Sequence, residues 1–189
     1  MAKVNTGKLF QVPLPGCIRL VPMNETRANL FSEFTTVGTV GLGGCFLIAI
    51  ASPKMCIMSH AGPLAAMTAA TLVQLVEAHR LHAHLLDAGS TVAWVLVGKL
   101  KSVLLLHLVD SIRDTVRGFG LEPQVAVYDA SDRGNRRGQG SAYVELELNV
   151  DGASVPRFFF EDRKLVDDWT WSGGFGASGM PAAAELFDD

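Results

Sequence analysis

Residues 39–45 read TVGLGGC and lead directly into an apolar run, Phe46 to Ala51. Glycine clusters of this kind are typical of tight turns and of places where another group approaches the backbone closely. A second apolar segment, Met55 to His60, follows after a short turn. We predict that the two segments are adjacent antiparallel strands. Their pairing would bring the start of one and the end of the other, Cys45 and His60, to the same edge of a sheet.

The residue types at this edge suggest a chemistry. A thiol and an imidazole within hydrogen-bond reach form an activated nucleophile, so Cys45 and His60 are candidate catalytic residues. Two structural interpretations compete with this one. Free cysteine is among the most buried residue types, so Cys45 could be a small core residue. His60 could equally be a core histidine whose ring nitrogens are satisfied internally.

Length and composition predict a single globular domain over residues 1–189. Hydrophobic residues make up 49% of the chain, which argues against disorder. The formal net charge of -3 gives no reason to expect nucleic acid or an anionic membrane as a partner. The most apolar window, Thr91 to Val109, carries Lys99 and Lys101 near its middle, so we expect no membrane span. The arginines of residues 133–137 are interpreted as a solvated loop.

Cysteine usage suggests the compartment. The three cysteines, Cys17, Cys45 and Cys56, are odd in number and lack the spacing of a disulfide framework. No secretory signal is visible near the first residues. We therefore expect an intracellular, cytoplasmic setting, in which thiols stay reduced. Cys17 and Cys56 are interpreted as core residues.

Neither a metal nor a cofactor is expected. Cys56 and His60 are potential zinc ligands, but no further convincing pair accompanies them. His79, His82 and His84 crowd one predicted helix and are interpreted as part of its exposed surface. The glycine-rich turn is no dinucleotide fingerprint, because a third glycine is missing and a strand follows it instead of a helix.

The remaining pattern predicts two helices and about eight strands. Helical spacing of apolar residues begins after Pro63 and stops before Gly89, and a second stripe extends from a Ser102 cap to Phe119. The first stripe comprises Leu64, Met67, Leu72, Leu75, Val76, Leu81, Leu85 and Leu86, and the second comprises Leu105, Leu106, Val109, Ile112, Val116 and Phe119.

Residues 22–27 are predicted to form a polar turn. Further strands are expected at Cys17–Val21, Thr35–Val40, Thr91–Val97, Val125–Tyr128, Tyr143–Leu148 and Val155–Phe160. The alternation in Tyr143–Leu148 predicts a strand with one wet face, and Asp151-Gly152 predicts the hairpin that follows it. The sum is an α/β (α+β) sandwich with mixed, largely antiparallel sheets, in which both helices cover one sheet face.

The TVGLGGC segment resembles the T-x-G-L-G-S-C segment of the chemoreceptor glutamine deamidases, the CheD family. In that family a histidine follows on the next strand and a proline comes within a few residues, as Pro63 follows His60 here. The loop of residues 129–137 and the hairpin at Gly152 are also similar. The resemblance covers residues 33–160, the predicted CheD-like core. Toxins of the cytotoxic-necrotizing-factor type, distant relatives that also deamidate glutamine, share the thiol–histidine arrangement.

This resemblance implies a fold like that of the CheD and cytotoxic-necrotizing-factor catalytic domains. It also implies a hydrolase, a cysteine-dependent protein-glutamine deamidase that releases ammonia through a thioester intermediate. The family's threonine, cysteine and histidine correspond to Thr39, Cys45 and His60, and the family assigns Thr39 the role of orienting the histidine or binding the amide. Backbone N–H groups around Gly43, Gly44 and Cys45 are candidate donors to the oxyanion, because glycines leave them accessible.

The departures from the family leave the substrate open. Gly44 stands where the bacterial enzymes usually have serine, and two of their segments are reduced or absent around residues 98–107. A chemoreceptor is therefore not the expected substrate. The same pair could act on a small-molecule amide, ester or thioester. Alternatively, the chain could be a catalytically silent binding module that docks a partner through its C-terminal extension, residues 161–189, with Trp169 and Trp171.

Overall fold

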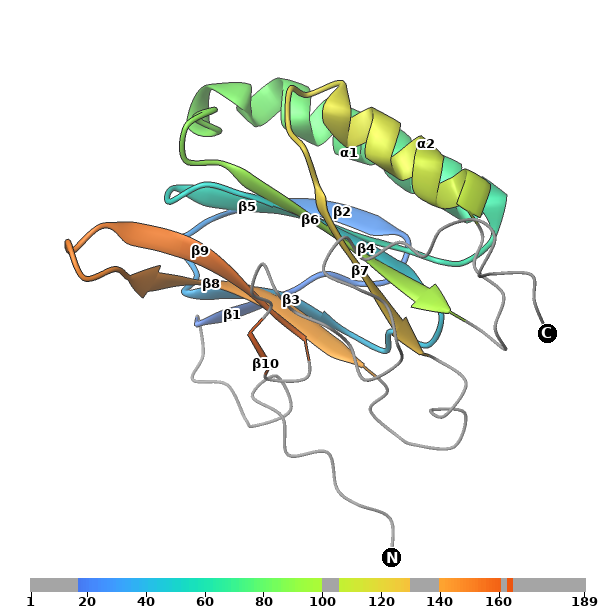
Figure 1. Ribbon diagram of the computed structural model, residues 1–189, viewed down its shortest axis with the longest axis horizontal. Coiled ribbons are helices and arrows are strands. Elements are labelled where there is room, and N and C mark those ends of the chain that lie inside the picture. Colours follow the sequence, from blue (N-terminus) through green and yellow to red (C-terminus); the bar gives the residue numbers. More distant parts are fainter. Residues whose placement is uncertain (1–16, 100–105, 130–139, 161–162, 165–189) are drawn as a thin grey trace, which may run out of the picture.

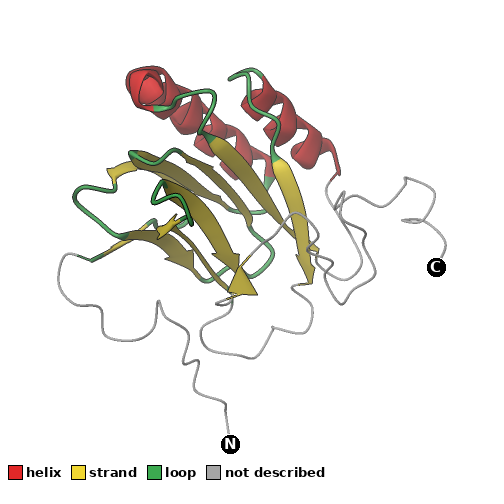
Figure 2. Ribbon diagram, turned by 60° about the vertical axis from the view of Figure 1, so that its left-hand side comes forward, coloured by secondary structure: helices red, strands yellow, loops and turns green. Residues whose placement is uncertain are grey.

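A computed structural model describes residues 17–99, 106–129, 140–160 and 163–164. Within these ranges the chain forms three layers, with two helices over one sheet and a second sheet beneath it (Figures 1 and 2). In chain order the elements are β1 (Ile18–Leu20), β2 (Glu25–Leu30), β3 (Thr36–Val40), β4 (Phe46–Ala51), β5 (Met55–Ala61), α1 (Ala65–His82), a 3-10 turn (Ala83–Leu85), β6 (Val92–Lys99), α2 (Leu106–Arg117), β7 (Gln124–Asp129), β8 (Ser141–Leu148), β9 (Ser154–Phe160) and β10 (Arg163–Lys164).

The two sheets have five strands each and are mostly antiparallel. The helix-covered sheet has the order β2-β5-β4-β6-β7, and the other has the order β1-β3-β8-β9-β10. Only β6 with β7 and β1 with β3 pair in parallel among the described strands. The predicted α+β architecture is confirmed, including the placement of both helices on one face of one sheet (Figure 2).

Alternation along the central strands builds two core layers. Phe46, Ile48 and Ile50 of β4 face the helices, where they pack with Val109 and Ile112 of α2. Leu47, Ala49 and Ala51 face the other sheet, where they pack with Val37, Val144 and Phe158. Because β4 is covered on both faces, it reads as a continuous apolar run instead of an alternating one.

The predicted pairing of the two strands after the glycine turn is confirmed. β4 and β5 are antiparallel, with Leu47 opposite His60. Ser52 closes the turn between them, because its N–H donates to Met55 O at 3.0 Å and its hydroxyl donates to Leu85 O at 2.8 Å. Cys45 and His60 consequently lie at the same edge of the sheet.

The predicted polar turn at residues 22–27 is wrong in its second half. Residues 25–30 form β2, an edge strand paired along its length with β5. Thr26, Ala28 and Leu30 point to the helix side, whereas Glu25 and Arg27 pair with each other on the other side. An edge strand tolerates such polar residues, and they hide the period-two pattern from the sequence.

The apolar stripe predicted for the first helix is also partly wrong. Leu64, Val76 and Leu81 are exposed, and Thr68 and Thr71 are buried instead. The two threonines tolerate burial because their hydroxyls have acceptors, Gly62 O at 3.1 Å for Thr68 and Met67 O at 2.9 Å for Thr71. β2 beneath the helix adds a further polar contact to this face. The Thr26 hydroxyl contacts Ser59 Oγ at 2.7 Å and Thr71 O at 3.3 Å.

The remaining predictions have mixed outcomes. The stripe of α2 is confirmed for Val109, Ile112 and Val116, which are buried. The strand β8 is present, but the prediction that one of its faces is exposed to solvent is wrong, because its first four residues are all buried. The hairpin between β8 and β9 is confirmed, with Gly152 at φ 79°.

Several sequence predictions lie outside the described residues. These are the Ser102 cap, the arginines of residues 133–137 and, apart from β10, the extension with Trp169 and Trp171. Neither helix of the described part is both long and apolar enough to cross a membrane.

One close contact between strands requires a glycine. A Cβ added at Gly98 of β6 would lie 2.5 Å from Gly44 Cα and 2.8 Å from the Tyr128 hydroxyl. We expect Gly98→Ala to lower the free energy of unfolding by about 1–3 kcal/mol, because the backbone at Gly44 has to move. Urea denaturation followed by circular dichroism measures this.

Gly89→Ala is the matched control, since a Cβ at Gly89 meets no described atom within 4 Å. Its effect should stay within about 0.5 kcal/mol or be slightly stabilising. Equal losses in the two variants would contradict the assigned contact.

Candidate active site

Three side chains predicted from the sequence lie between the two sheets, and two of them, Thr39 and His60, are in contact. Thr39 lies on β3 of one sheet, and His60 lies near the end of β5 in the other. Cys45 immediately precedes β4. Thr39 and His60 are each 1% exposed, and Cys45 is 4% exposed. The strands therefore hold all three side chains in the inner layer, at one edge of the sandwich.

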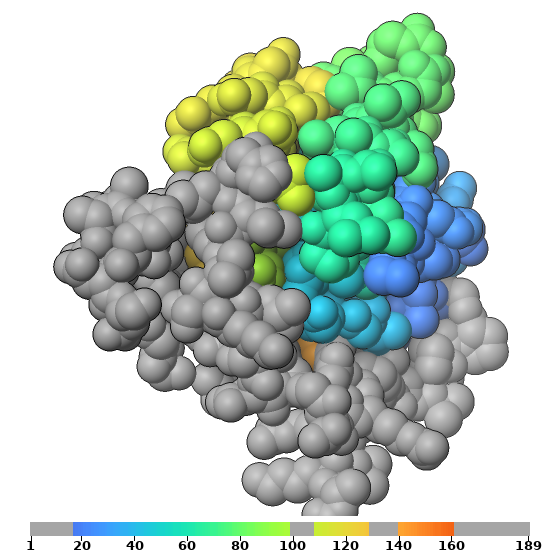
Figure 3. Space-filling model, turned by 90° about the vertical axis from the view of Figure 1, so that its right-hand side faces the viewer, coloured from blue at the N-terminus to red at the C-terminus, as the bar shows by residue number. Residues whose placement is uncertain are grey.

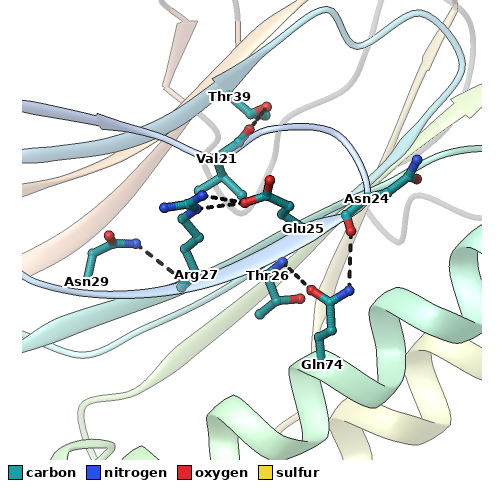
Figure 4. Close-up of polar contacts among 8 residues, drawn as sticks. All are labelled: Val21, Asn24, Glu25, Thr26, Arg27, Asn29, Thr39 and Gln74. Atoms are coloured by element: carbon teal, nitrogen blue, oxygen red, sulfur yellow. Dashed lines mark hydrogen bonds and ion pairs between the residues drawn. The ribbon is translucent and has the colours of Figure 1, made fainter.

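The Thr39 hydroxyl determines the protonation pattern of the histidine. Its oxygen lies 2.7 Å from Val21 O and 2.8 Å from His60 Nδ1. A carbonyl oxygen can only accept, so the single hydroxyl proton is donated to Val21 O (Figure 4). Thr39 Oγ1 must then accept from His60 Nδ1–H. In the neutral ring this leaves Nε2 unprotonated, with its lone pair available.

The other ring nitrogen of His60 has no hydrogen-bond partner among the described residues, although it is buried. Burial disfavours the charged ring and lowers the pKa of His60 from its usual 6.5 to about 4. His60 is therefore neutral at pH 7. A buried, neutral imidazole with a free Nε2 lone pair is chemically a general base.

Cys45 lies diagonally across the ladder from His60, because Leu47, two residues further on, is the direct partner of His60. Diagonal neighbours in such a ladder are about 7–8 Å apart. The thiol donates to Met23 Sδ at 3.8 Å. Burial raises the pKa of Cys45, and a hydrogen bond from the Gly43 N–H partly opposes that rise. The site thus holds a neutral thiol and a neutral imidazole.

The backbone conformation of the turn at residues 41–44 requires glycine at two positions. Gly41 and Gly44 have φ values of 80° and 96°, which side chains rarely adopt, so a serine at position 44 would be strained. Two of the three candidate oxyanion donors have internal acceptors here. Gly43 N–H donates to Gly41 O at 2.8 Å, and Gly44 N–H donates to the Tyr128 hydroxyl at 3.1 Å. The N–H of Cys45 has no acceptor among the described residues.

Tyr128 is a residue of the site that the sequence did not indicate. Its buried hydroxyl accepts from Gly44 N–H and donates to Cys45 O at 3.0 Å, so it clamps the backbone on both sides of the Gly44–Cys45 bond. Tyr128 stands in β7, two strands away from β4. An aromatic residue in an apolar strand is typical of any core, and no local signal marks it.

The segment between β1 and β2 is the second missed part, and it forms a wall of the site. Val21 O accepts from Thr39, Met23 contacts the thiol, and the Asn24 N–H donates to His60 O. Asn24 adopts φ 64°, which asparagine tolerates better than most residues. Gln74 of α1 holds the segment from the other side, donating to Asn24 O at 3.3 Å (Figure 4). Figure 3 shows the blue segment lying against the green helix α1.

The other candidate groups do not form a site. The described residues contain no cluster of three or more side chains that could hold a metal ion. His79 stacks on Phe119 with ring centroids 3.9 Å apart, so it is partly covered rather than exposed. Cys56 is buried, as predicted, but Cys17 is only half-buried, contrary to the core prediction.

Comparisons with known proteins find structural similarity but no relative by sequence. No family model matches the sequence, and no curated protein matches it as a relative. Among solved structures, the C-terminal domain of CNFy from Yersinia pseudotuberculosis is similar, with 12% sequence identity and a TM-score of 0.36. The match covers 75% of this chain and 55% of that one, so the chain spans about half the length of the structure it matches.

The depressed pKa of His60 predicts a pH dependence of stability. Between pH 6.5 and about pH 4 the unfolded chain binds a proton at this residue that the folded chain does not. Stability is therefore lost as the pH falls through this window. From pH 7 to pH 5 we expect the wild type to lose about 2 kcal/mol more unfolding free energy than His60→Gln, which has no titrating ring.

Urea denaturation of both proteins at several pH values provides the measurement. All other titrating groups, the partly covered His79 included, are common to both proteins and cancel in the difference. Parallel curves for the two proteins would show that His60 is not held neutral by burial.

Proposed function

We propose that this protein is a cysteine-dependent amide hydrolase, and specifically a deamidase that acts on the carboxamide of glutamine side chains. The observation that carries the proposal is the tautomer of His60. The Thr39 hydroxyl has to accept from Nδ1–H because it donates to Val21 O, so the unpaired Nε2 lone pair remains for the thiol. Cys45, His60 and Thr39 are also the residues that match the CheD motif in type and order.

The first half of the reaction forms a thioester. Nε2 of His60 takes the proton from Cys45 Sγ while the sulfur attacks the carboxamide carbon. The carbonyl double bond becomes a single C–O⁻ bond in the tetrahedral intermediate. When the C–N bond breaks, the imidazolium gives its proton to the leaving nitrogen and ammonia departs. The ring returns to its neutral form, with Nδ1–H still donated to Thr39.

The second half hydrolyses the thioester. Nε2 of His60 now takes a proton from a water molecule, whose oxygen attacks the thioester carbon. The C–S bond breaks, the imidazolium returns its proton to the sulfur, and the product is a carboxylic acid. One water is consumed and one ammonia is released, with no change of oxidation state and no cofactor.

Cys45 and His60 are both neutral in the resting state, and this determines how the thiol has to be activated. Burial holds the pKa of Cys45 above and that of His60 below the usual values, so a stable thiolate–imidazolium pair is disfavoured. Proton transfer then has to accompany the attack, as in hydroxyl nucleophiles activated by histidine. The N–H of Cys45, which has no acceptor within the described ranges, is the first candidate to stabilise the oxyanion, and Gly44 N–H joins it only by leaving Tyr128.

The raised pKa of Cys45 also suits the competing hypothesis, a silent binding module. Ammonia release from glutamine-containing peptides, with mass spectrometry of the product, separates the two. The wild type should convert the amide to the acid, and Cys45→Ser should lower the rate more than about a thousandfold. His60→Gln should lower it by about 10² to 10⁴. A free small amide assayed in parallel tells the protein-substrate hypothesis from the small-molecule one.

Thr39→Val tests the tautomer argument within the same assay. It should lower the rate by about tenfold or more, because the ring loses the acceptor that keeps Nδ1 protonated. Thr36→Val is the matched control, since Thr36 is buried on the same strand and its hydroxyl has no hydrogen bond within the described ranges. Absence of ammonia release from every amide, or full activity in Cys45→Ser, would overturn the proposed function.

A further inference from the structure

The resting thiol has its hydrogen-bond partner in a methionine and makes no hydrogen bond to the histidine. Cys45 Sγ donates to Met23 Sδ at 3.8 Å, whereas His60 Nε2 has no partner among the described residues. His60 Nδ1 is already used by Thr39. The thiol proton therefore has its acceptor in Met23. His60 Nε2, the proposed base, is buried and does not receive this proton in the resting state.

The backbone that carries Met23 is fastened on both sides. Before it, Val21 N–H donates to Gly38 O at 2.8 Å. After it, Asn24 Oδ1 accepts from Gly62 N–H at 2.9 Å and Asn24 O accepts from Gln74 Nε2. These bonds connect the segment to β3, to the end of β5 and to α1. Because the backbone is held on both sides, we expect that any movement here is a rotation of the Met23 side chain.

The Met23 side chain itself is free to move. It is 53% exposed, although its sulfur touches a thiol that is 4% exposed. Methionine is unbranched and has three rotatable bonds, so it can swing out of a contact at little cost. A thiol-to-thioether hydrogen bond is weak, because both sulfur groups are poor partners.

We propose that Met23 is a gate and positioning residue for the nucleophile, and this rests on the proposed function. In the resting state its sulfur holds the Cys45 thiol proton away from His60. A carboxamide on an aliphatic stem, as in a glutamine side chain, displaces the Met23 side chain and takes its apolar place. The thiol then turns to His60 Nε2, so that proton transfer begins only when substrate is present.

The experiment is the second-order rate of Cys45 alkylation by iodoacetamide at pH 7.5, followed by peptide mass spectrometry. Met23→Ala and Met23→Leu both remove the sulfur acceptor, but leucine keeps the apolar bulk. Both variants should react about fivefold faster than wild type, the factor expected for loss of one weak hydrogen bond. His60→Gln added to Met23→Ala should remove this gain, because the released proton has no base to go to.

Leu148→Ala is the matched control, an exposed apolar residue at the end of β8, and its rate should equal that of wild type. A wild-type rate in Met23→Ala, or a gain only in Met23→Ala and not in Met23→Leu, would overturn the proton-holding role. A gain that survives His60→Gln would overturn it as well. Alkylation needs no substrate, so this inference can fail while ammonia release continues, and ammonia release can fail while the alkylation pattern holds.

Discussion

One hydroxyl group connects the two sheets at the point where the chemistry is proposed. Thr39 on β3 donates to Val21 O and accepts from Nδ1 of His60 on β5. Removal of this hydroxyl would leave a buried carbonyl and a buried ring N–H without partners, and each costs about 1–3 kcal/mol. The same pair of bonds that holds the sheets in register at this edge also directs the lone pair of Nε2 to the inner layer.

Close backbone packing supplies the second constraint. Gly98 lets β6 approach the turn at Gly44, and Tyr128 reaches across to bond the backbone on either side of Cys45. The nucleophile is thus held by main-chain contacts instead of side-chain bulk. Such preorganisation restricts the movement that the site requires to small side-chain rotations, above all those of the thiol and of Met23.

The local features of the chain could be predicted from the sequence, and the features made by distant segments could not. Two apolar segments around a short turn were enough to place Cys45 and His60 at one edge. Thr39 stood out only through the resemblance to the CheD motif. Met23 and Tyr128 escaped notice because their contacts are with residues 22 and 83 or more positions away, and β2 escaped because its polar residues have partners on α1 and β5.

Thr39 keeps His60 as a neutral ring with its proton on Nδ1. Nitrogen-15 NMR of labelled protein at pH 7 tests this most directly, because protonated and unprotonated ring nitrogens have well-separated shifts. We expect a protonated Nδ1 and an unprotonated Nε2 for His60. Thr39→Val should lose this fixed pattern while Thr36→Val keeps it. A proton on Nε2 at pH 7, whether in a neutral or a charged ring, would show that Thr39 does not fix the neutral Nδ1–H tautomer.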